Sequence, residues 1–194
     1  MPRIGMEPAR RGALVEAAVA EIGHTGLRDV TVAKIARRAG MSPALAHHYF
    51  GSKEAIFVAA MRHLLTLYAA EVRGALSMAA TPRARLEAII RASFTPSQFR
   101  PETVAAWLDL YVQAQRSAPA RRLLHVYQRR LRSNLSHALR PLAPDAAATL
   151  ASGCAAMIDG LYLRQALGEG GIAPETAIAV LLHYLDTGLP AEDT

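Results

Sequence analysis

Two adjacent histidines, His47 and His48, stand near the end of the segment AGMSPALAHHYFGSKEAIF, which covers residues 39–57. Imidazole nitrogens can bind a metal, move a proton in catalysis or form hydrogen bonds with another molecule. On a helix, consecutive residues point about 100° apart, whereas two histidines that share one metal ion usually stand four residues apart. No third ligand follows at a helical spacing. The pattern therefore disfavours a metal site and leaves a recognition surface or a plain solvent-exposed face.

Enzymatic chemistry is an alternative, with His47, His48, His125 or His183 as a general base. The sequence has no phosphate-binding glycine loop, no G-x-S-x-G, no H-E-x-x-H and no pair of carboxylates at a fixed helical spacing. We therefore expect a protein that is not an enzyme and that needs neither a metal nor a cofactor.

The charge of the chain is unevenly distributed. Its 194 residues have a formal net charge of +6, and residues 1–62 hold nine Lys or Arg against five Asp or Glu. This excess favours a polyanionic partner at the N-terminal end. No apolar run approaches the roughly 18 residues of a membrane span, and no secretion signal is evident. The single cysteine, Cys154, excludes an internal disulfide and is expected to be a buried, inert thiol in a cytoplasmic protein.

Helix start signals are frequent, whereas the alternation typical of strands is absent. Thr31, Ser42 and Ser52 each precede a helical pattern and can act as N-caps, and Pro43 suits a first helical turn. Prolines near helix starts divide the rest of the chain. We expect an all-α fold of about nine helices, at residues 8–26, 32–39, 43–50, 53–76, 82–95, 101–116, 119–140, 144–168 and 174–187.

Residues 31–50 have the pattern of a helix-turn-helix. The turn falls at Ala39-Gly40-Met41, where glycine tolerates a positive φ. Small or apolar side chains are needed where the two helices cross, and the candidates are Val32, Ile35, Ala36, Met41, Leu45 and Phe50. This arrangement predicts that the second helix presents its other face to the outside.

The outer face of that second helix has the chemistry to contact DNA. Its short or polar residues suit base edges in a major groove, and they are Ser42, Pro43, Ala44, His47 and His48. Other residues can hold phosphates, which fixes register without reading sequence, and they are Thr31, Tyr49, Lys53, Arg10 and Arg11. The sequence thus predicts a reader of double-stranded DNA.

The stretch TVAKIARRAGMSPALAHHYFGSKEAIF resembles the DNA-binding signature of the TetR family of bacterial repressors. The shared frame is T-x-x-x-I-A-x-x-A-G-x-S, then H-x-F/Y-F and S-K-E-x-I/L. The resemblance implies a homodimer with a three-helix DNA-binding head, residues 1–52, and an effector-binding and dimerisation domain of about six helices, residues 53–194. It assigns phosphates to Thr31, Tyr49 and Lys53, and bases to the outer face of the second helix. The family often has lysine or threonine at Pro43 and an aromatic or hydroxyl residue at His47, so no operator sequence can be transferred.

The rest of the chain resembles a narrower group, the BetI-type, choline-responsive repressors. The patches that carry this resemblance are MPRIGMEPARRGALVEAA, AAWLDLYVQAQ, RRLRSNL and AAMIDGLYLRQAL. A quaternary ammonium effector requires aromatic faces and a carboxylate. Trp107 and Tyr111 stand four residues apart on one helix face, with Tyr127 and Asp159 as further contributors, whereas Asp109 points away from Trp107. The aromatic pair equally suits a packed core, and an unrelated effector controlling metabolic or efflux genes is the alternative.

Small residues in the stretch ASGCAAMIDG favour the close approach of another helix. We expect the helices at 144–168 and 174–187 to form a four-helix bundle between two subunits. The residues expected in this dimer interface are Leu150, Met157, Leu161, Ile178, Leu181, Leu182 and Leu185. A dimer can engage two half-sites of a palindromic operator, and an effector that shifts the helix at 53–76 would change their spacing.

Overall fold

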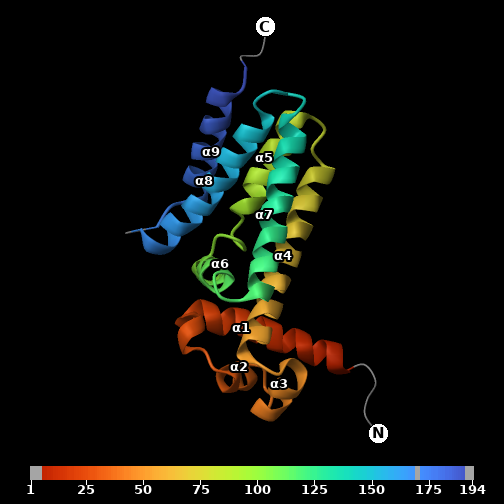
Figure 1. The fold of residues 1–194 in the computed structure, drawn as a ribbon, viewed down its shortest axis with the longest axis vertical. Helices are drawn as coiled ribbons and strands as arrows, with labels where there is room; N and C mark the ends of the chain where they lie inside the picture. Colours follow the sequence, from red (N-terminus) through yellow and green to blue (C-terminus); the bar gives the residue numbers. More distant parts are fainter. Residues whose placement is uncertain (1–5, 169–170, 191–194) are drawn as a thin grey trace. The chain divides into compact units, whose positions relative to one another are not determined.

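The computed structural model describes residues 6–168 and 171–190, which form nine α-helices and no strand (Figure 1). The expectation of an all-α fold is confirmed. The helices are α1 (Met6–Asp29), α2 (Val32–Arg38), α3 (Pro43–Phe50), α4 (Lys53–Ser77), α5 (Pro82–Ser93), α6 (Pro101–Ala114), α7 (Ala118–Leu139), α8 (Ala147–Leu167) and α9 (Pro174–Gly188).

The helices belong to two compact units. Within the described residues, the head unit comprises residues 6–65 and 101–123, and the body unit comprises residues 66–100 and 124–190 without 169–170. α4 and α7 each begin in the head unit and end in the body unit. The head unit is therefore larger than the DNA-binding domain expected over residues 1–52. It also contains the first half of α4 and α6, which packs along α1.

The three expected N-caps of the head unit are in place. The side-chain oxygens of Thr31, Ser42 and Ser52 accept hydrogen bonds from backbone N–H groups three residues later, at 3.2, 3.2 and 3.1 Å. Each bond satisfies a donor that has no partner within its own helix. Between α2 and α3, Gly40 has φ 67°, a conformation that side chains disfavour. The helix-turn-helix is thus set by local sequence signals.

α1 is interrupted where a helix stop was predicted. Gly26 has φ 73° and ψ 156°, and the chain regains a helical turn before Asp29. We call residues 26–29 the corner. The hydrogen-bond partners of its backbone groups come from other helices.

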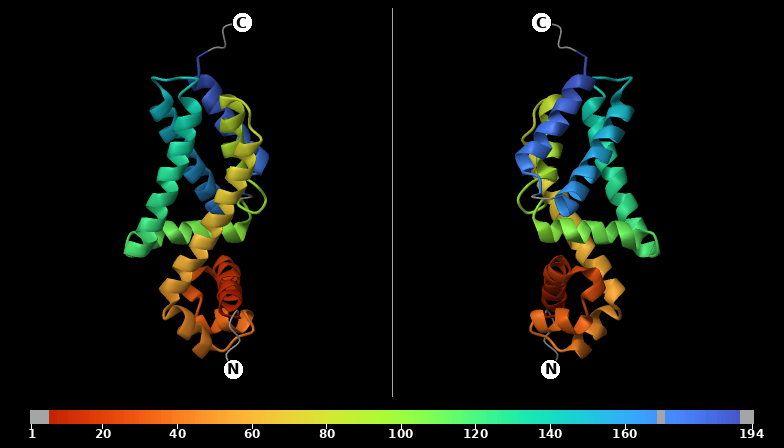
Figure 2. Two further views of the ribbon diagram at one scale, coloured as in Figure 1. Left: turned by 90° about the vertical axis from the view of Figure 1, so that its right-hand side faces the viewer. Right: turned by 90° about the vertical axis from the view of Figure 1, so that its left-hand side faces the viewer.

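In the body unit, α8 and α9 lie side by side (Figures 1 and 2). A Cβ added at Gly153 of α8 would collide with the Tyr184 hydroxyl of α9, so a larger residue at this contact would have to displace the Tyr184 side chain. Gly160, in contrast, has open space around it. The small-residue stretch therefore brings a helix close through Gly153, and that helix belongs to the same chain.

The residues expected at the dimer interface fall into two groups. Leu150, Leu161, Leu181 and Leu185 are buried within the protomer, and Leu181 and Leu185 are 0% exposed. Met157, Ile178 and Leu182 keep part of their surface. Since a side chain without exposed area can bury none against a partner, Leu181 and Leu185 stabilise the protomer core first.

α4 has an apolar composition along much of its length. Among the described helices it alone is long and apolar enough to cross a membrane by length and composition, with 39% of its apolar 18-residue window buried inside the molecule. Core helices commonly satisfy the same criterion, and α4 contributes Ile56, Phe57 and Met61 to the core.

We expect Ser42→Ala to destabilise α3 by about 1 kcal/mol, because the Leu45 N–H loses its acceptor. Hydrogen exchange monitored by mass spectrometry should show faster exchange in residues 42–50. Ser133→Ala, at an exposed site inside α7, is the matched control and should change little. Unchanged protection in Ser42→Ala would contradict the role of this cap.

Candidate functional site

The predicted base-reading residues lie together on the exposed side of α3. Pro43, Ala44, His47 and His48 are all exposed, while Ala46 on the opposite side is fully buried. Residues three and four apart share a helix face, so these four side chains form one continuous surface. Ser42 is exposed beside them, although its hydroxyl already caps α3.

His47 lies close to the C-terminal end of α3. Its Nδ1 is 3.3 Å from the Gly51 carbonyl oxygen. A carbonyl oxygen only accepts, so the tautomer that forms this hydrogen bond has its proton on Nδ1, and Nε2 of the neutral ring is then an acceptor. His48 instead packs against Tyr49, with ring centroids 5.5 Å apart. The two neighbouring histidines therefore have different surroundings, as their angular separation suggested.

Arg11 holds α1 against the end of α3. Its guanidinium donates to the Tyr49 carbonyl oxygen at 2.8 Å and lies 4.6 Å from the centre of the Phe50 ring. It also lies 3.8 Å from the Glu7 carboxylate. The expected phosphate contact of Arg11 stays a prediction. Within the head unit, this side chain already contacts Tyr49 and Phe50 of α3.

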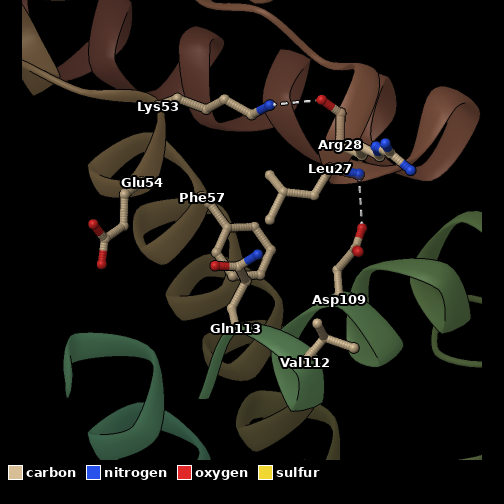
Figure 3. A pocket seen from close by; sticks show the side chains of 8 residues that line it. All are labelled: Leu27, Arg28, Lys53, Glu54, Phe57, Asp109, Val112 and Gln113. Carbon is tan, nitrogen blue, oxygen red and sulfur yellow. Dashed lines mark hydrogen bonds between the residues drawn. The ribbon is translucent and has the colours of Figure 1, made fainter. Parts of the chain in front are cut away.

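Lys53 and Asp109 hold the corner from two sides (Figure 3). The Leu27 N–H donates to Asp109 Oδ2 of α6 at 2.8 Å, and Lys53 Nζ of α4 donates to the Arg28 carbonyl oxygen at 3.0 Å. Because Gly26 interrupts the helical ladder, backbone groups of the corner need partners from elsewhere. Asp109 was expected only to point away from Trp107, and its task could not be read from the sequence.

Burial raises the pKa of the Asp109 carboxyl above its ordinary value, while the Leu27 N–H and the charge of Lys53 act in the opposite direction. The carboxylate is thus disfavoured by desolvation but kept as an acceptor by its two neighbours. This balance makes Asp109 sensitive to any change at the corner.

A cavity of about 450 Å³ lies next to the corner in the head unit (Figure 3). It is lined by Leu27, Arg28, Lys53, Glu54, Phe57, Asp109, Val112 and Gln113. Lys53 and Asp109 are committed to the corner, and Glu54 accepts a hydrogen bond from the Ser117 hydroxyl. None of the four residues predicted to bind an effector lines this cavity.

Those four residues divide between the two units. Trp107 and Tyr111 belong to the head unit, where their rings lie 6.4 Å apart and Trp107 is buried. Tyr127 and Asp159 belong to the body unit. Tyr127 packs edge-on against Tyr68 of α4, with ring centroids 6.0 Å apart.

Tyr127 is part of a larger group of aromatic side chains in the body unit. Phe94, Phe99 and Tyr162 contact one another, with centroid distances of 5.0, 5.9 and 5.3 Å. The Tyr162 hydroxyl donates to the Ser93 carbonyl oxygen, and the Tyr68 hydroxyl lies 3.0 Å from Ser93 Oγ. We call Tyr68, Phe94, Phe99, Tyr127 and Tyr162 the aromatic cluster.

Carboxylates lie near this cluster. Burial raises the pKa of Tyr68 to about 12 against the effect of its hydrogen bond to Ser93, and the charges of Asp159 and Glu71 contribute in the same direction as burial. Burial likewise raises the pKa of Tyr162 well above its ordinary value, again with contributions from Glu71 and Asp159. The two phenols therefore remain neutral.

Sequence reasoning missed Tyr68, Phe94, Phe99 and Tyr162, because the members of the cluster come from elements far apart in the chain. One signal was available: Asp159 and Tyr162 are three residues apart on α8 and so share a helix face.

Cys154 is fully buried, as expected, and burial raises its pKa to about 12, which keeps the thiol protonated.

Replacing Asp109 tests the corner. Asp109→Ala leaves the buried Leu27 N–H without its acceptor, and we expect a loss of about 1–3 kcal/mol in the free energy of unfolding, measured with urea. Asp109→Asn keeps an oxygen acceptor at the same place and is the control. Equal stabilities of the Ala and Asn variants would refute the hydrogen bond as the cause.

The raised pKa of Asp109 also predicts the direction in which the stability difference between Asp109→Asn and the unsubstituted protein changes with pH. A carboxyl whose pKa is raised in the folded state adds stability at low pH and loses that contribution as the pH rises through its folded-state pKa. The stability of Asp109→Asn relative to the unsubstituted protein should therefore fall as the pH drops from 7 toward about 4. A relative stability that rises over this range would contradict the raised pKa.

Comparison with known proteins places this geometry in a family. Residues 14–60 match the model of bacterial regulatory proteins of the tetR family, and residues 82–190 match the C-terminal domain of BetI-type transcriptional repressors. A relative from Rhizobium meliloti, "HTH-type transcriptional regulator BetI", is 54% identical over 98% of this chain and 95% of its own length. The protein of the same name from Brucella anthropi is 51% identical over 99% of this chain and 100% of its own length.

Solved structures share the fold. A transcriptional regulator from Pseudomonas aeruginosa has a TM-score of 0.81 at 26% identity, over 95% of this chain and 92% of its own. A regulator from Saccharomonospora viridis, solved in complex with choline, has a TM-score of 0.84 at 24% identity, over 92% and 96% of the two chains. At nearly full-length identities above 50%, the chain belongs to the TetR family, in its BetI-type group, and is a DNA-binding transcriptional repressor and not an enzyme.

Proposed function

We propose that this repressor binds a palindromic operator as a homodimer in the cytoplasm and is released by a small quaternary ammonium compound, with choline as the leading candidate. The observation that carries the effector class is the aromatic cluster with Asp159 and Glu71 beside its tyrosines. TetR-family regulators bind DNA, dimerise and respond to small molecules.

On the DNA side, the exposed face of α3 enters the major groove, and Thr31, Tyr49 and Lys53 hold phosphates on either side. Arg10 and Arg11 add positive charge along α1. His47 reads a base through Nε2: as an acceptor it pairs with the amino group of adenine or cytosine, and after protonation it donates to guanine. With Nδ1 bound to the Gly51 carbonyl oxygen, only Nε2 of His47 is left for a base contact.

The dimer forms through α8 and α9. Met157, Ile178 and Leu182 contribute the area that the protomer leaves uncovered, supported from inside by Leu150, Leu161, Leu181 and Leu185. Leu163, Leu167 and Val180 are exposed apolar residues of the same two helices and extend this surface. Two heads joined in this way reach half-sites one helical turn apart, about 34–36 Å.

On the effector side, a quaternary ammonium group cannot donate a hydrogen bond and is recognised by ring faces and negative charge. Tyr68, Tyr127 and Tyr162 supply electron-rich rings, and Asp159 supplies the charge. Trp107 and Tyr111 are the further aromatic candidates on α6. The choline complex of the Saccharomonospora viridis regulator supports the choice of ligand.

Binding is coupled to release through α4 and α6. α4 carries Tyr68 in the body unit and Lys53 in the head unit on one continuous helix. α6 carries Asp109 on the same helix as Trp107 and Tyr111. An effector that displaces either helix disturbs the corner, and it favours release as far as it binds the displaced form better.

We expect His47→Ala and Lys53→Ala to differ in what they change. His47→Ala should alter preference at one base pair of each half-site, because it removes a base contact. Lys53→Ala should weaken all sequences alike and reduce the salt dependence, on a logarithmic scale, by about one unit per lost phosphate contact. Fluorescence anisotropy with a randomised operator set and varied salt measures both.

The slope of affinity against salt concentration also distinguishes the loss of a phosphate contact from the loss of the hydrogen bond to the corner. Lys53 donates to the Arg28 carbonyl oxygen, so loss of a purely structural role would lower affinity at an unchanged slope. If His47→Ala lowers affinity without changing base preference, its reading role is wrong.

The Asp159 carboxylate is tested with choline. Asp159→Asn keeps the shape and removes the charge, and we expect affinity for choline to fall at least about tenfold in titration calorimetry. Asp145→Asn, at an exposed site of the body unit, is the matched control. Operator affinity without choline should be unchanged in both variants. Absence of heat with choline up to millimolar concentration in the unsubstituted protein would rule out choline and leave the repressor assignment intact.

A further inference from the structure

One polar group in the body unit is buried without a partner. The side chain of Gln98 is 2% exposed, and its Oε1 accepts no hydrogen bond from the residues that the structure describes. An amide oxygen in this state destabilises the folded protein relative to a satisfied one. Buried unsatisfied acceptors are rare in native proteins, and each one calls for a donor.

Gln98 lies in the short segment between α5 and α6, which several bonds hold in place. The Glu71 carboxylate accepts from the Thr95 hydroxyl at 2.9 Å and from the Ser97 hydroxyl at 2.7 Å. The Gln98 N–H donates to the Thr95 carbonyl oxygen at 3.0 Å, which closes a tight turn. The segment therefore keeps a defined conformation, and the unpaired oxygen is not the result of a loose loop.

The same segment builds the aromatic cluster. Phe94 stands at its start, and Phe99 follows Gln98 directly and contacts Tyr162. Glu71, which holds the segment, is also one of the carboxylates whose charge raises the pKa of Tyr68 and Tyr162. The unpaired oxygen thus belongs to the part of the chain that we propose binds a quaternary ammonium compound.

We infer that Gln98 Oε1 accepts a hydrogen bond from a hydroxyl group of the effector. The inference rests on the proposed function and deepens it: the ring faces and Asp159 recognise the cation, and Gln98 recognises a hydroxyl attached to it. The repressor is then selective for hydroxylated quaternary ammonium compounds over fully alkylated ones. A site that offers a buried acceptor discriminates against ligands without a donor, because they leave that acceptor unpaired.

Two ligands of similar size test this: choline, and ethyltrimethylammonium, in which the hydroxyl is absent. Titration calorimetry on the intact protein should give about tenfold tighter binding of choline. Gln98→Met preserves length and removes the acceptor, so the preference should vanish while affinity for ethyltrimethylammonium stays the same or rises. Gln115→Met, at an exposed glutamine of the α6–α7 connection, is the matched control and should keep the preference.

The outcomes separate the two levels of the proposal. Equal affinities of the unsubstituted protein for both ligands overturn the role of Gln98 and leave the effector class standing, and this measurement needs no variant to fold. A preference that survives in Gln98→Met overturns it as well, since the hydroxyl group would then be recognised without the Gln98 oxygen. Failure of both ligands to bind overturns the effector class together with this inference. The ligand-free Gln98→Met should melt no lower than the unsubstituted protein, whereas a purely structural role predicts a lower melting temperature.

Discussion

Gly26 imposes the constraint on which the DNA-binding half of the molecule depends. Its positive φ turns the chain out of α1, and the backbone groups that follow need partners outside their own helix. Asp109 accepts a hydrogen bond from the Leu27 N–H, and Lys53 donates one to the Arg28 carbonyl oxygen. Both α6 and α4 are therefore hydrogen-bonded to the segment that leads into α2. The position of the helix-turn-helix is thereby tied to two helices that also carry proposed effector residues.

In the body unit, hydroxyl groups link the aromatic rings and the Glu71 carboxylate to the segment that follows α5. Ser93 accepts from one tyrosine hydroxyl through its carbonyl oxygen and pairs with another through its own hydroxyl, which fixes the orientation of both rings. Glu71 is occupied by two hydroxyl donors. Because the phenols stay neutral, the cluster retains the electron-rich ring faces that a cation without hydrogen-bond donors requires.

Local rules explain which parts could be predicted from the sequence. The caps at Thr31, Ser42 and Ser52 and the exposed face of α3 depend on residues within one or two turns, and there prediction and structure agree. Tyr68, Phe94 and Phe99 meet only through tertiary packing, which no helical spacing encodes. Leu181 and Leu185 have the pattern of an interface stripe, yet the protomer buries them itself, because a single sequence does not say which helix covers an apolar face. The acceptor role of Asp109 likewise depends on an amide 82 residues away.

The head unit is discontinuous in sequence, and this limits its modularity. Residues 6–65 lack the acceptor that the corner uses, since Asp109 arrives with residues 101–123. A chimera that exchanges only the N-terminal helices between two regulators would pair a foreign corner with a resident α6. Transplanted operator specificity therefore requires that the α6 surface, or at least a carboxylate in register with the first amide after the glycine, travels with the recognition helix.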